Sequence, residues 1–317
     1  MQRIQRRLVV PEGLKGRRLD QAAAELLPEY SRSRLKTWID AGRLTVGGQA
    51  LRARTLLKGG EELALDTDVE AAVAVEPEAI ALTVVHADEA LIVVDKPAGL
   101  VVHPGAGNPS GTLQNALLHL APELAVLPRA GLIHRLDKDT SGLLLVARTL
   151  PSHTALTAAL ARRDIQRTYR AVCNGVLTGG GQIDAPIGRH RRERTKMAIA
   201  DDGREARTRY RVVERFRAHT HCELELETGR THQIRVHMAH IRAPLVGDST
   251  YGGRPRLPPA PSAALVAALR GFRRQALHAS RLAFTHPSTG AALSFDSPLP
   301  PDLADLLAAL RADAAGK

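Results

Sequence analysis

The sequence His134-Arg135-Leu136-Asp137-Lys138-Asp139-Thr140-Ser141-Gly142 is followed directly by an apolar run at residues 143–147. A short and continuous apolar run predicts a strand that is buried on both faces of a sheet. The charged residues before it then form a turn at the mouth of that strand. Such a turn holds the carboxylate of Asp137 where a substrate can reach it, so Asp137 is a candidate functional residue. The alternative is an aspartate that only caps a local turn.

Two further segments place charged residues beside apolar runs. Residues 91–100 read LIVVDKPAGL, and residues 227–237 read ETGRTHQIRVH. Together with the opening stretch they resemble, in the same order, the three motifs of the RluA family of pseudouridine synthases. Segments 101–109 and 248–255 are most similar to the members that act on large-subunit ribosomal RNA. Several long motifs in the right order are far more specific than one short pattern.

This resemblance covers nearly the whole chain, from about residue 19 to residue 313. It implies an isomerase that converts specific uridines of large-subunit (23S) ribosomal RNA, in the helix 69 stem-loop, to pseudouridine. Such a reaction breaks the bond between the base and the sugar, turns the base and rejoins it through carbon, so it needs no cofactor and no metal. The partner implied is ribosomal RNA, naked or in a precursor particle.

The resemblance also implies the roles of individual residues. Asp137 matches the catalytic aspartate, which either attacks the nucleoside or removes a sugar proton. Arg235 matches the basic residue of the third motif, and we expect it to pair with Asp137 and favour its charged form. Tyr169 matches the tyrosine that stacks on the target base, an interaction of ~1–3 kcal/mol. Arg135 would replace the flipped uridine in the RNA stack, and Leu245 would line the uracil pocket.

His134 permits two interpretations. It contacts a backbone phosphate, or it is a structural histidine whose nitrogens are satisfied within the protein.

The composition favours a nucleic-acid partner. The 317 residues include 44 lysines and arginines against 33 acidic residues, a formal charge of +11. Such an excess favours a polyanion, and nucleic acid ahead of a membrane. The two cysteines predict a reducing compartment without disulfides. Residues 1–10 lack the apolar segment of a signal peptide, and no apolar run is long enough to span a bilayer, so we expect a cytoplasmic protein. We also expect a monomer.

The chain is predicted to contain two domains. Residues 1–17 are an extension, residues 18–75 a small domain, residues 76–82 a linker and residues 83–317 the catalytic domain. In the small domain, Ser31 is a plausible N-cap of a second helix. The basic residues of that helix surround an apolar face, and the pattern resembles the S4 RNA-binding domain. The alternative is a solvated basic face. The residues proposed to bind RNA there are Arg32, Arg34 and Lys36.

Strand-like and helix-like segments alternate irregularly after residue 82. Strands are expected near residues 83–85, 91–94, 143–146, 169–172 and 222–226, and helices near residues 113–120, 152–162, 232–240, 263–270 and 301–311. Because there is no regular βαβ rhythm, we predict an α+β fold with a mainly antiparallel, mixed sheet. The catalytic domain of the family has such a sheet.

The densest basic run lies at residues 189–196, between two strand-like segments. We expect a loop that grips the RNA stem and makes affinity fall steeply with salt. Its candidate contacts are Arg189, Arg191, Arg192, Arg194 and Lys196.

Three other functions are possible. His232, His237 and His240 could belong to a metal hydrolase, although metal sites need further ligands at defined spacing. Asp137 and Asp139 could be the acid and nucleophile of a nucleoside glycosidase. The S4-like part alone could serve a ribosome-assembly factor without enzymatic activity.

Overall fold

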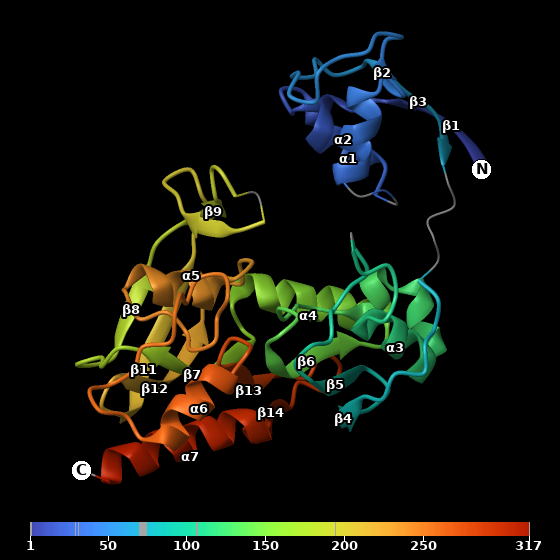
Figure 1. Cartoon of the computed structure of the whole chain (residues 1–317). Coiled ribbons are helices and arrows are strands. Elements are labelled where there is room, and N and C mark those ends of the chain that lie inside the picture. The colour runs from blue at the N-terminus through green and yellow to red at the C-terminus, as the bar shows by residue number, and fades with distance from the viewer. Residues whose placement is uncertain are drawn as a thin grey trace. The chain divides into compact units, whose positions relative to one another are not determined.

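The computed structural model describes residues 2–28, 30, 32–69, 75–105, 107–193 and 195–316. Two sequence predictions, the N-cap Ser31 and the RNA contact Arg194, lie outside this part. The chain divides into two compact units, residues 1–74 and 75–317 (Figure 1). Within the described residues, no helix is both long and apolar enough to cross a membrane.

The N-terminal unit packs two helices on a small sheet. The helices are α1 (Leu19–Leu26) and α2 (Arg32–Asp40), and the strand order is β1 (Gln2–Val9), β3 (Glu62–Val69), β2 (Leu44–Val46). Residues 2–9 were predicted to be an extension, but β1 pairs with β3 along its whole length. The core is apolar, as the helical spacing predicted, and includes Leu19, Leu35, Ile39, Leu44 and Leu63.

Residues 76–82 were predicted to be a linker, but they are bound to the second unit, residues 75–317, which contains the predicted catalytic domain and is called the catalytic unit below. The side-chain amide of Asn115 donates to the carbonyl of Glu76 at 2.8 Å. The Glu78 carboxylate accepts a hydrogen bond of 2.9 Å from the backbone N–H of Gly111. Val75 and Leu82 pack against the main core of this unit. The predicted linker is therefore part of the folded catalytic unit.

The catalytic unit is built on a nine-stranded sheet. The strand order is β4-β5-β6-β13-β7-β12-β11-β8, with β14 paired to β13, and only the β6–β13 pair is parallel. The α+β class with a mainly antiparallel sheet is therefore confirmed. The strands are β4 (Thr83–Ala87), β5 (Leu91–Lys96), β6 (Ser141–Ala147), β7 (Gln166–Asn174), β8 (Gly181–Asp184), β11 (Arg207–Arg215), β12 (His219–Leu226), β13 (Leu277–Thr285) and β14 (Ala292–Asp296).

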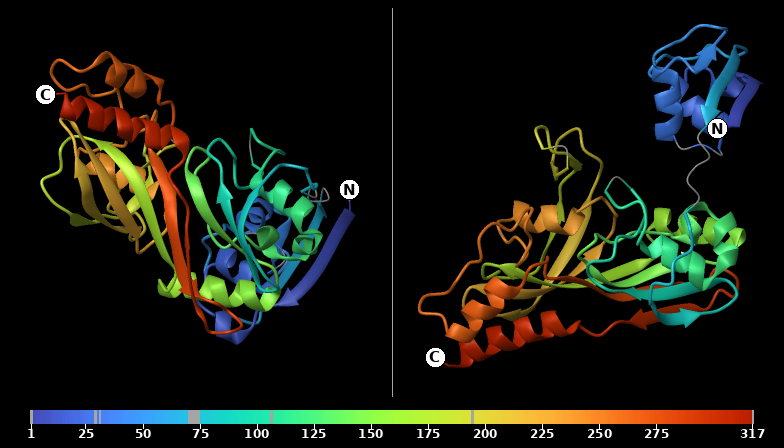
Figure 2. Two further views of the ribbon diagram at one scale, coloured as in Figure 1. Left: turned by 90° about the horizontal axis from the view of Figure 1, so that it is seen from below. Right: turned by 45° about the vertical axis from the view of Figure 1, so that its right-hand side comes forward.

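Among its described residues, this unit also contains a separate two-stranded ribbon, five α-helices and two short 3-10 helices. The ribbon consists of β9 (Ile187–Arg189) and β10 (Met197–Ile199), and in Figure 2 it stands out from the body of the unit. The helices are α3 (Leu113–Leu120), α4 (Leu150–Arg162), α5 (Gln233–His240), α6 (Ala263–Gly271) and α7 (Pro301–Ala315), and they match the predicted positions closely.

The helices cover both faces of the sheet because the strands alternate. On one face, Ile92, Val94, Leu144 and Val146 share a core with α3 and α5. On the other, the alternate residues of β5 and β6 pack with Leu156 of α4. On the face of β7 that carries Val172, α6 and α7 lie side by side (Figures 1 and 2). All seven residues of β6 are buried, as its continuous apolar run predicted.

Gly142 allows β6 to approach β13. Its φ is +112°, and a Cβ at this position would lie 2.3 Å from the carbonyl oxygen of Ala279, its partner on β13. Only glycine adopts this conformation without strain and leaves room for the neighbouring strand.

We expect Gly142→Ala to lower the free energy of unfolding by about 3 kcal/mol or more, because it adds a backbone clash to an unfavourable φ. Gly290→Ala is the matched control, since Gly290 also has positive φ (+73°) but open space around its Cβ position. It should cost about 1 kcal/mol. Denaturant unfolding measures both, and equal losses would contradict the packing argument.

His221 is a buried titratable group on β12. His221 is only 5% exposed, and neither of its ring nitrogens has a hydrogen-bond partner within the described chain. Burial, together with the charge of Arg170, lowers its pKa to about 4. In the unfolded chain, the pKa of a histidine is about 6.5. Between pH 6.5 and 4, the unfolded chain therefore binds a proton at His221 and the folded chain does not.

Stability should therefore fall as the pH drops through this window and be fully present above about pH 6.5. We expect His221 to account for about 1–2 kcal/mol of the loss between pH 7 and 5. His221→Gln should flatten the pH dependence of the unfolding free energy, whereas His119→Gln, at an exposed position, should leave it unchanged. Identical slopes for wild type and His221→Gln would refute this assignment.

Candidate active site

The turn before β6 brings Asp137 to a buried arginine. Arg235 Nη1 donates to Asp137 Oδ2 at 3.0 Å, so the predicted pair is present. The same guanidinium donates through Nε and Nη2 to both carboxylate oxygens of Asp248, at 2.7 and 2.9 Å. Burial opposes the charged form of Arg235, but the hydrogen bonds and charge of Asp248, followed by those of Asp137, raise its pKa. The guanidinium is thus fixed between two carboxylates.

Asp248 was not singled out in the sequence. Its side chain is fully buried and also accepts hydrogen bonds from the backbone N–H groups of Thr250 and Tyr251, at 2.9 and 3.1 Å. Asp137 instead keeps 18% of its side chain exposed. The two carboxylates therefore differ: one anchors Arg235, and the other faces solvent.

His232 lies just before α5, in the left-handed conformation (φ +57°), and not within the helix as predicted. Its Nε2 is 3.9 Å from Asp137 Oδ1, and its Nδ1 shares a hydrogen bond of 2.9 Å with the Tyr251 hydroxyl. His232 and Arg235 thus approach the same carboxylate, and only the pairing of Arg235 with Asp137 was predicted from the sequence.

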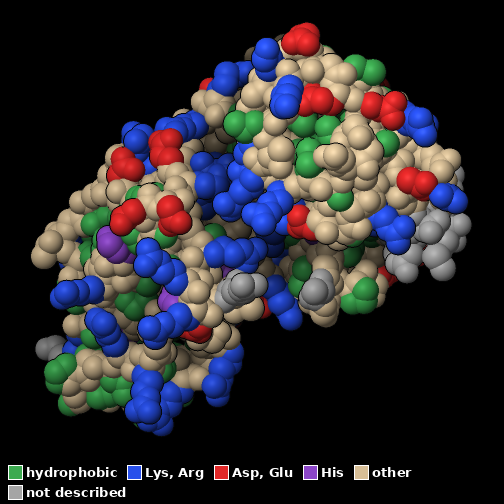
Figure 3. Space-filling model, turned by 90° about the horizontal axis from the view of Figure 1, so that it is seen from above, with side chains coloured by type: hydrophobic (Ala, Val, Ile, Leu, Met, Phe, Trp, Pro, Cys, Tyr) green, Lys and Arg blue, Asp and Glu red, His purple; other side chains and the backbone are tan. Residues whose placement is uncertain are grey.

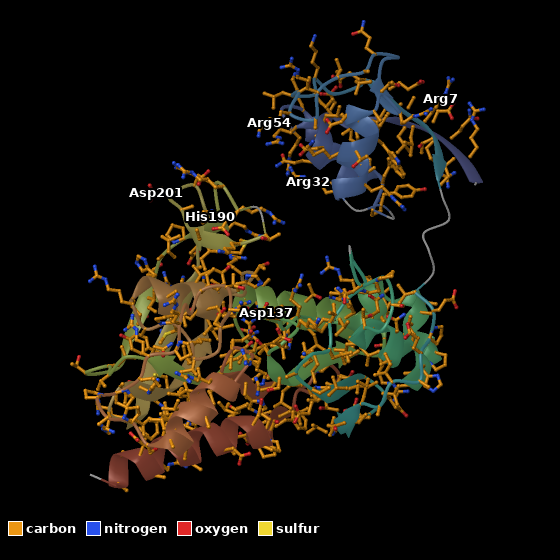
Figure 4. The ribbon with its side chains drawn as sticks, viewed as in Figure 1. Arg7, Arg32, Arg54, Asp137, His190 and Asp201 are labelled. Atoms are coloured by element: carbon orange, nitrogen blue, oxygen red, sulfur yellow. The ribbon has the colours of Figure 1, made fainter. Side chains whose placement is uncertain are left out.

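Two cavities meet at Asp137. The larger has a volume of about 470 Å³ and the smaller about 50 Å³, and both are lined by Arg135, Asp137, Tyr169, Leu226 and Arg230. Apolar side chains, including Ile234 and Leu277, line the smaller one. Figure 4 places Asp137 in the middle of the catalytic unit. The smaller cavity thus combines apolar walls with the charged groups around Asp137, and the larger one continues from it.

Tyr169 and Arg135 line both cavities, but Leu245 does not. Tyr169 is 4% exposed, and burial raises the pKa of its phenol, which stays protonated near neutral pH. Arg135 is exposed at the mouth. Leu245, predicted to line the uracil pocket, is fully buried in the main core and lines neither cavity; Leu226 and Leu277 occupy the walls instead.

The backbone of the Asp137 turn is tied down by side chains from distant segments. The ammonium of Lys96 is fully buried and donates to the carbonyls of Pro97, Leu100 and Lys138, at 2.8, 2.9 and 2.9 Å. Burial lowers its pKa to about 8 despite the charges of Asp139 and Asp137. Gln275 donates to the Thr140 hydroxyl at 3.0 Å, and Arg274 to the Asp139 carbonyl at 3.3 Å. The turn is therefore a rigid support for Asp137.

The predicted basic loop lies on the β9–β10 ribbon. Arg189, Arg191 and Arg192 are exposed, whereas Lys196 pairs with Glu193 at 2.6 Å. His190 belongs to this loop, and Figure 4 shows that it lies away from Asp137. Figure 3 views the molecule from the side on which β9 and α5 lie, and Lys and Arg side chains are abundant there.

In the N-terminal unit, the predicted basic residues are partly engaged within the protein. Arg32 pairs with Asp20 at 2.7 Å, and Lys36 pairs with Asp40. Arg34 lies over the Trp38 ring, 5.8 Å from its centroid. Half or more of the side chains of Arg32 and Lys36 remain exposed, so both can still meet a phosphate.

The histidines considered for a metal site are not grouped. His237 uses both ring nitrogens, with Thr208 Oγ1 at 2.9 Å and the Ala185 carbonyl at 3.0 Å. The described part of the chain contains no group of three potential His, Cys, Asp or Glu ligands.

Comparison with known families agrees with this architecture. Residues 90–240 match the RNA pseudouridylate synthase family, and residues 17–63 match the S4 domain. The chain belongs to the RNA pseudouridine synthases, which are isomerases acting on RNA, and carries an N-terminal S4 domain.

Individual relatives are similar over almost their whole length. The chain is 56% identical over 310 residues to ribosomal large subunit pseudouridine synthase D of Pseudomonas aeruginosa, covering 98% of this chain and 97% of the relative. Identity to the protein of the same name from Escherichia coli strain K12 is 51% over 313 residues, covering 98% and 96%. Among solved structures, human RNA pseudouridylate synthase domain containing 4 matches with a TM-score of 0.57 at 27% identity, covering 72% of this chain and 93% of that one.

We expect Lys96→Met to lower the single-turnover rate of pseudouridine formation about a hundredfold, because loss of the tether displaces the turn by a fraction of an ångström or more. RNA affinity should change much less. Lys138→Met is the control, because the Lys138 side chain is exposed and only its carbonyl is bound by Lys96. Thermal unfolding verifies that each variant is folded at the assay temperature. Equal rates in both variants would show that the tether does not position the turn.

Proposed function

We propose that this protein converts uridines of large-subunit (23S) ribosomal RNA to pseudouridine, with helix 69 as the target stem-loop. The observation that carries this proposal is the Asp137 carboxylate, held by Arg235 at the junction of two cavities. The target is supported by the relatives of more than 50% identity that bear the name ribosomal large subunit pseudouridine synthase D. The two cysteines are free, which agrees with a cytoplasmic site of action; we retain a monomer as a prediction.

In this proposal, Asp137 is the catalytic carboxylate, acting by nucleophilic attack or by removal of a sugar proton. Arg235 orients it through the hydrogen bond from Nη1 to Oδ2. The flipped uracil enters the smaller cavity and stacks on Tyr169. Arg135, exposed at the mouth, takes the place of the base in the RNA stack.

Binding away from the reaction centre is assigned to two basic surfaces. The first is the β9–β10 loop with Arg189, Arg191, Arg192 and Lys196, and we include Arg194 from the sequence. The second is the basic face of α2 in the S4 domain. Each phosphate contact releases counterions, so affinity should weaken as salt rises.

We expect the wild-type protein, incubated with unmodified large-subunit ribosomal RNA and no cofactor, to form pseudouridine in the helix 69 loop. Asp137→Asn should abolish the product while RNA binding persists, since the variant keeps the size of the side chain but loses its charge. Asp139→Asn, two residues away on the same turn, is the control and should retain activity. Carbodiimide adducts read by reverse transcription map the product.

Other outcomes discriminate among the functions. Reverse-transcription stops at other positions of the RNA would support pseudouridine formation but contradict helix 69 as the target. Release of free uracil would indicate a glycosidase. Tight binding without any product would favour an assembled particle as substrate, or a role in assembly alone.

A further inference from the structure

The larger cavity beside Asp137 carries a strong excess of positive charge. Five arginines line it, against two acidic residues, Asp137 and Glu227. Glu227 is already engaged by arginines, with Arg209 at 2.8 Å and Arg207 at 3.1 Å. Asp137 is held by Arg235. The lining arginines are Arg129, Arg135, Arg163, Arg167 and Arg230. Arg163 pairs with Glu205 at 2.9 Å and approaches Glu227 at 3.7 Å, so the excess of positive charge comes from the other four.

Arg167 is the buried member of this set. It is 7% exposed, and no carboxylate of the described chain pairs with it. Its Nη2 makes one long hydrogen bond of 3.4 Å to the carbonyl of Leu226, and its Nε is buried without a partner. Arg235, buried to the same degree, has two carboxylates. A buried cation without a counter-charge is unfavourable, and such groups mark places where an anion binds.

His134 adds a second unused donor to the same cavity. Its Nε2 accepts a hydrogen bond of 3.3 Å from the backbone N–H of Leu145, so the ring proton of the neutral histidine is on Nδ1. Burial, followed by the charge of Arg167, lowers the pKa of His134 to about 3, and the ring is neutral at physiological pH. Nδ1 is buried and has no partner in the described chain.

The strand register explains how Arg167 relates to the base. Arg167 and Tyr169 are two residues apart on β7, so their side chains project from the same face of the sheet. Both line the larger cavity, but only Tyr169 also lines the smaller one. The guanidinium is held against the backbone of Gly229, where a Cβ would lie 2.8 Å from Nη1. Arg167 is thus fixed next to the base pocket and outside it.

We propose that Arg167, aided by the Nδ1–H of His134, binds a phosphodiester oxygen of the RNA strand beside the target uridine. Arg167 is then a substrate-positioning residue: Tyr169 contacts the base while Arg167 holds the backbone. The inference rests on the proposed function, because it assigns a phosphate of the same RNA substrate. A phosphodiester fits better than a uracil carbonyl, because Arg167 does not line the smaller cavity.

The test is Arg167→Met, which keeps an unbranched apolar stem and removes the charge. Binding is measured by titrating the helix 69 RNA stem-loop over a range of salt concentrations. We expect affinity at low salt to fall tenfold to a hundredfold, and the slope of log affinity against log salt to decrease by about one phosphate contact. Arg162→Met is the control, since Arg162 is exposed, pairs with Asp164 and does not line the cavity.

A second measurement locates the phosphate. Single methylphosphonate substitutions around the target uridine remove one backbone charge at a time. In the wild type, methylphosphonate substitution at one position should weaken RNA binding. The same substitution should cause no further loss of affinity in Arg167→Met. Equal effects of the substitutions on wild type and variant would overturn the proposal.

Thermal unfolding of the free protein separates binding from a structural role. Because Arg167 has no counter-charge in the free protein, Arg167→Met should be at least as stable as wild type. A marked drop in Tm, with an unchanged salt slope, would show that the residue is structural. These readouts do not require turnover, so failure of the wild type to modify this RNA would count against naked helix 69 as the substrate without deciding the role of Arg167.

Discussion

The site depends on one buried guanidinium that is shared by two carboxylates. Arg235 loses most of its hydration on folding, and Asp248 and Asp137 replace the lost water with charge-assisted hydrogen bonds. Removal of one partner from such a group costs about 3–5 kcal/mol, because a buried charge is left without compensation. The three residues come from the turn before β6, from α5 and from the segment after it, so their association fixes three separate parts of the chain.

This arrangement explains why the turn is so heavily constrained. The Asp137 carboxylate is partly exposed, so its position depends on its hydrogen bond to Arg235 and on the backbone that carries it. Lys96, Arg274 and Gln275 supply that constraint through the main chain of residues 138–139 and the Thr140 hydroxyl. Gly142 lets β6 approach β13 immediately afterwards. The backbone support is therefore rigid, while the Asp137 carboxylate stays partly exposed.

Much of this could be predicted from the sequence, for identifiable reasons. The run at residues 143–147 is apolar without interruption, so its burial followed directly, and the pairing of Arg235 with Asp137 followed from family motifs. Leu245 was misplaced because an apolar residue suits a pocket wall and a core equally well. Strand β1 was missed because its residues are largely polar and its partner β3 lies about sixty positions away. The role of Lys96 depends on carbonyls brought together only by folding.

Arg235 and Arg167 show what burial of the same side chain implies in two settings. Arg235 is satisfied by the protein and stabilises the site before any substrate arrives. Arg167 is equally buried but has no carboxylate, so its favourable partner must come from outside the described chain. A cation held in advance needs no reorganisation when a phosphate arrives, and an anion that enters a poorly hydrated cavity interacts more strongly than it would at the surface. The free protein thus carries a buried charge without a counter-charge, and this difference between the two arginines separates support of Asp137 from the capture of RNA that we propose for Arg167.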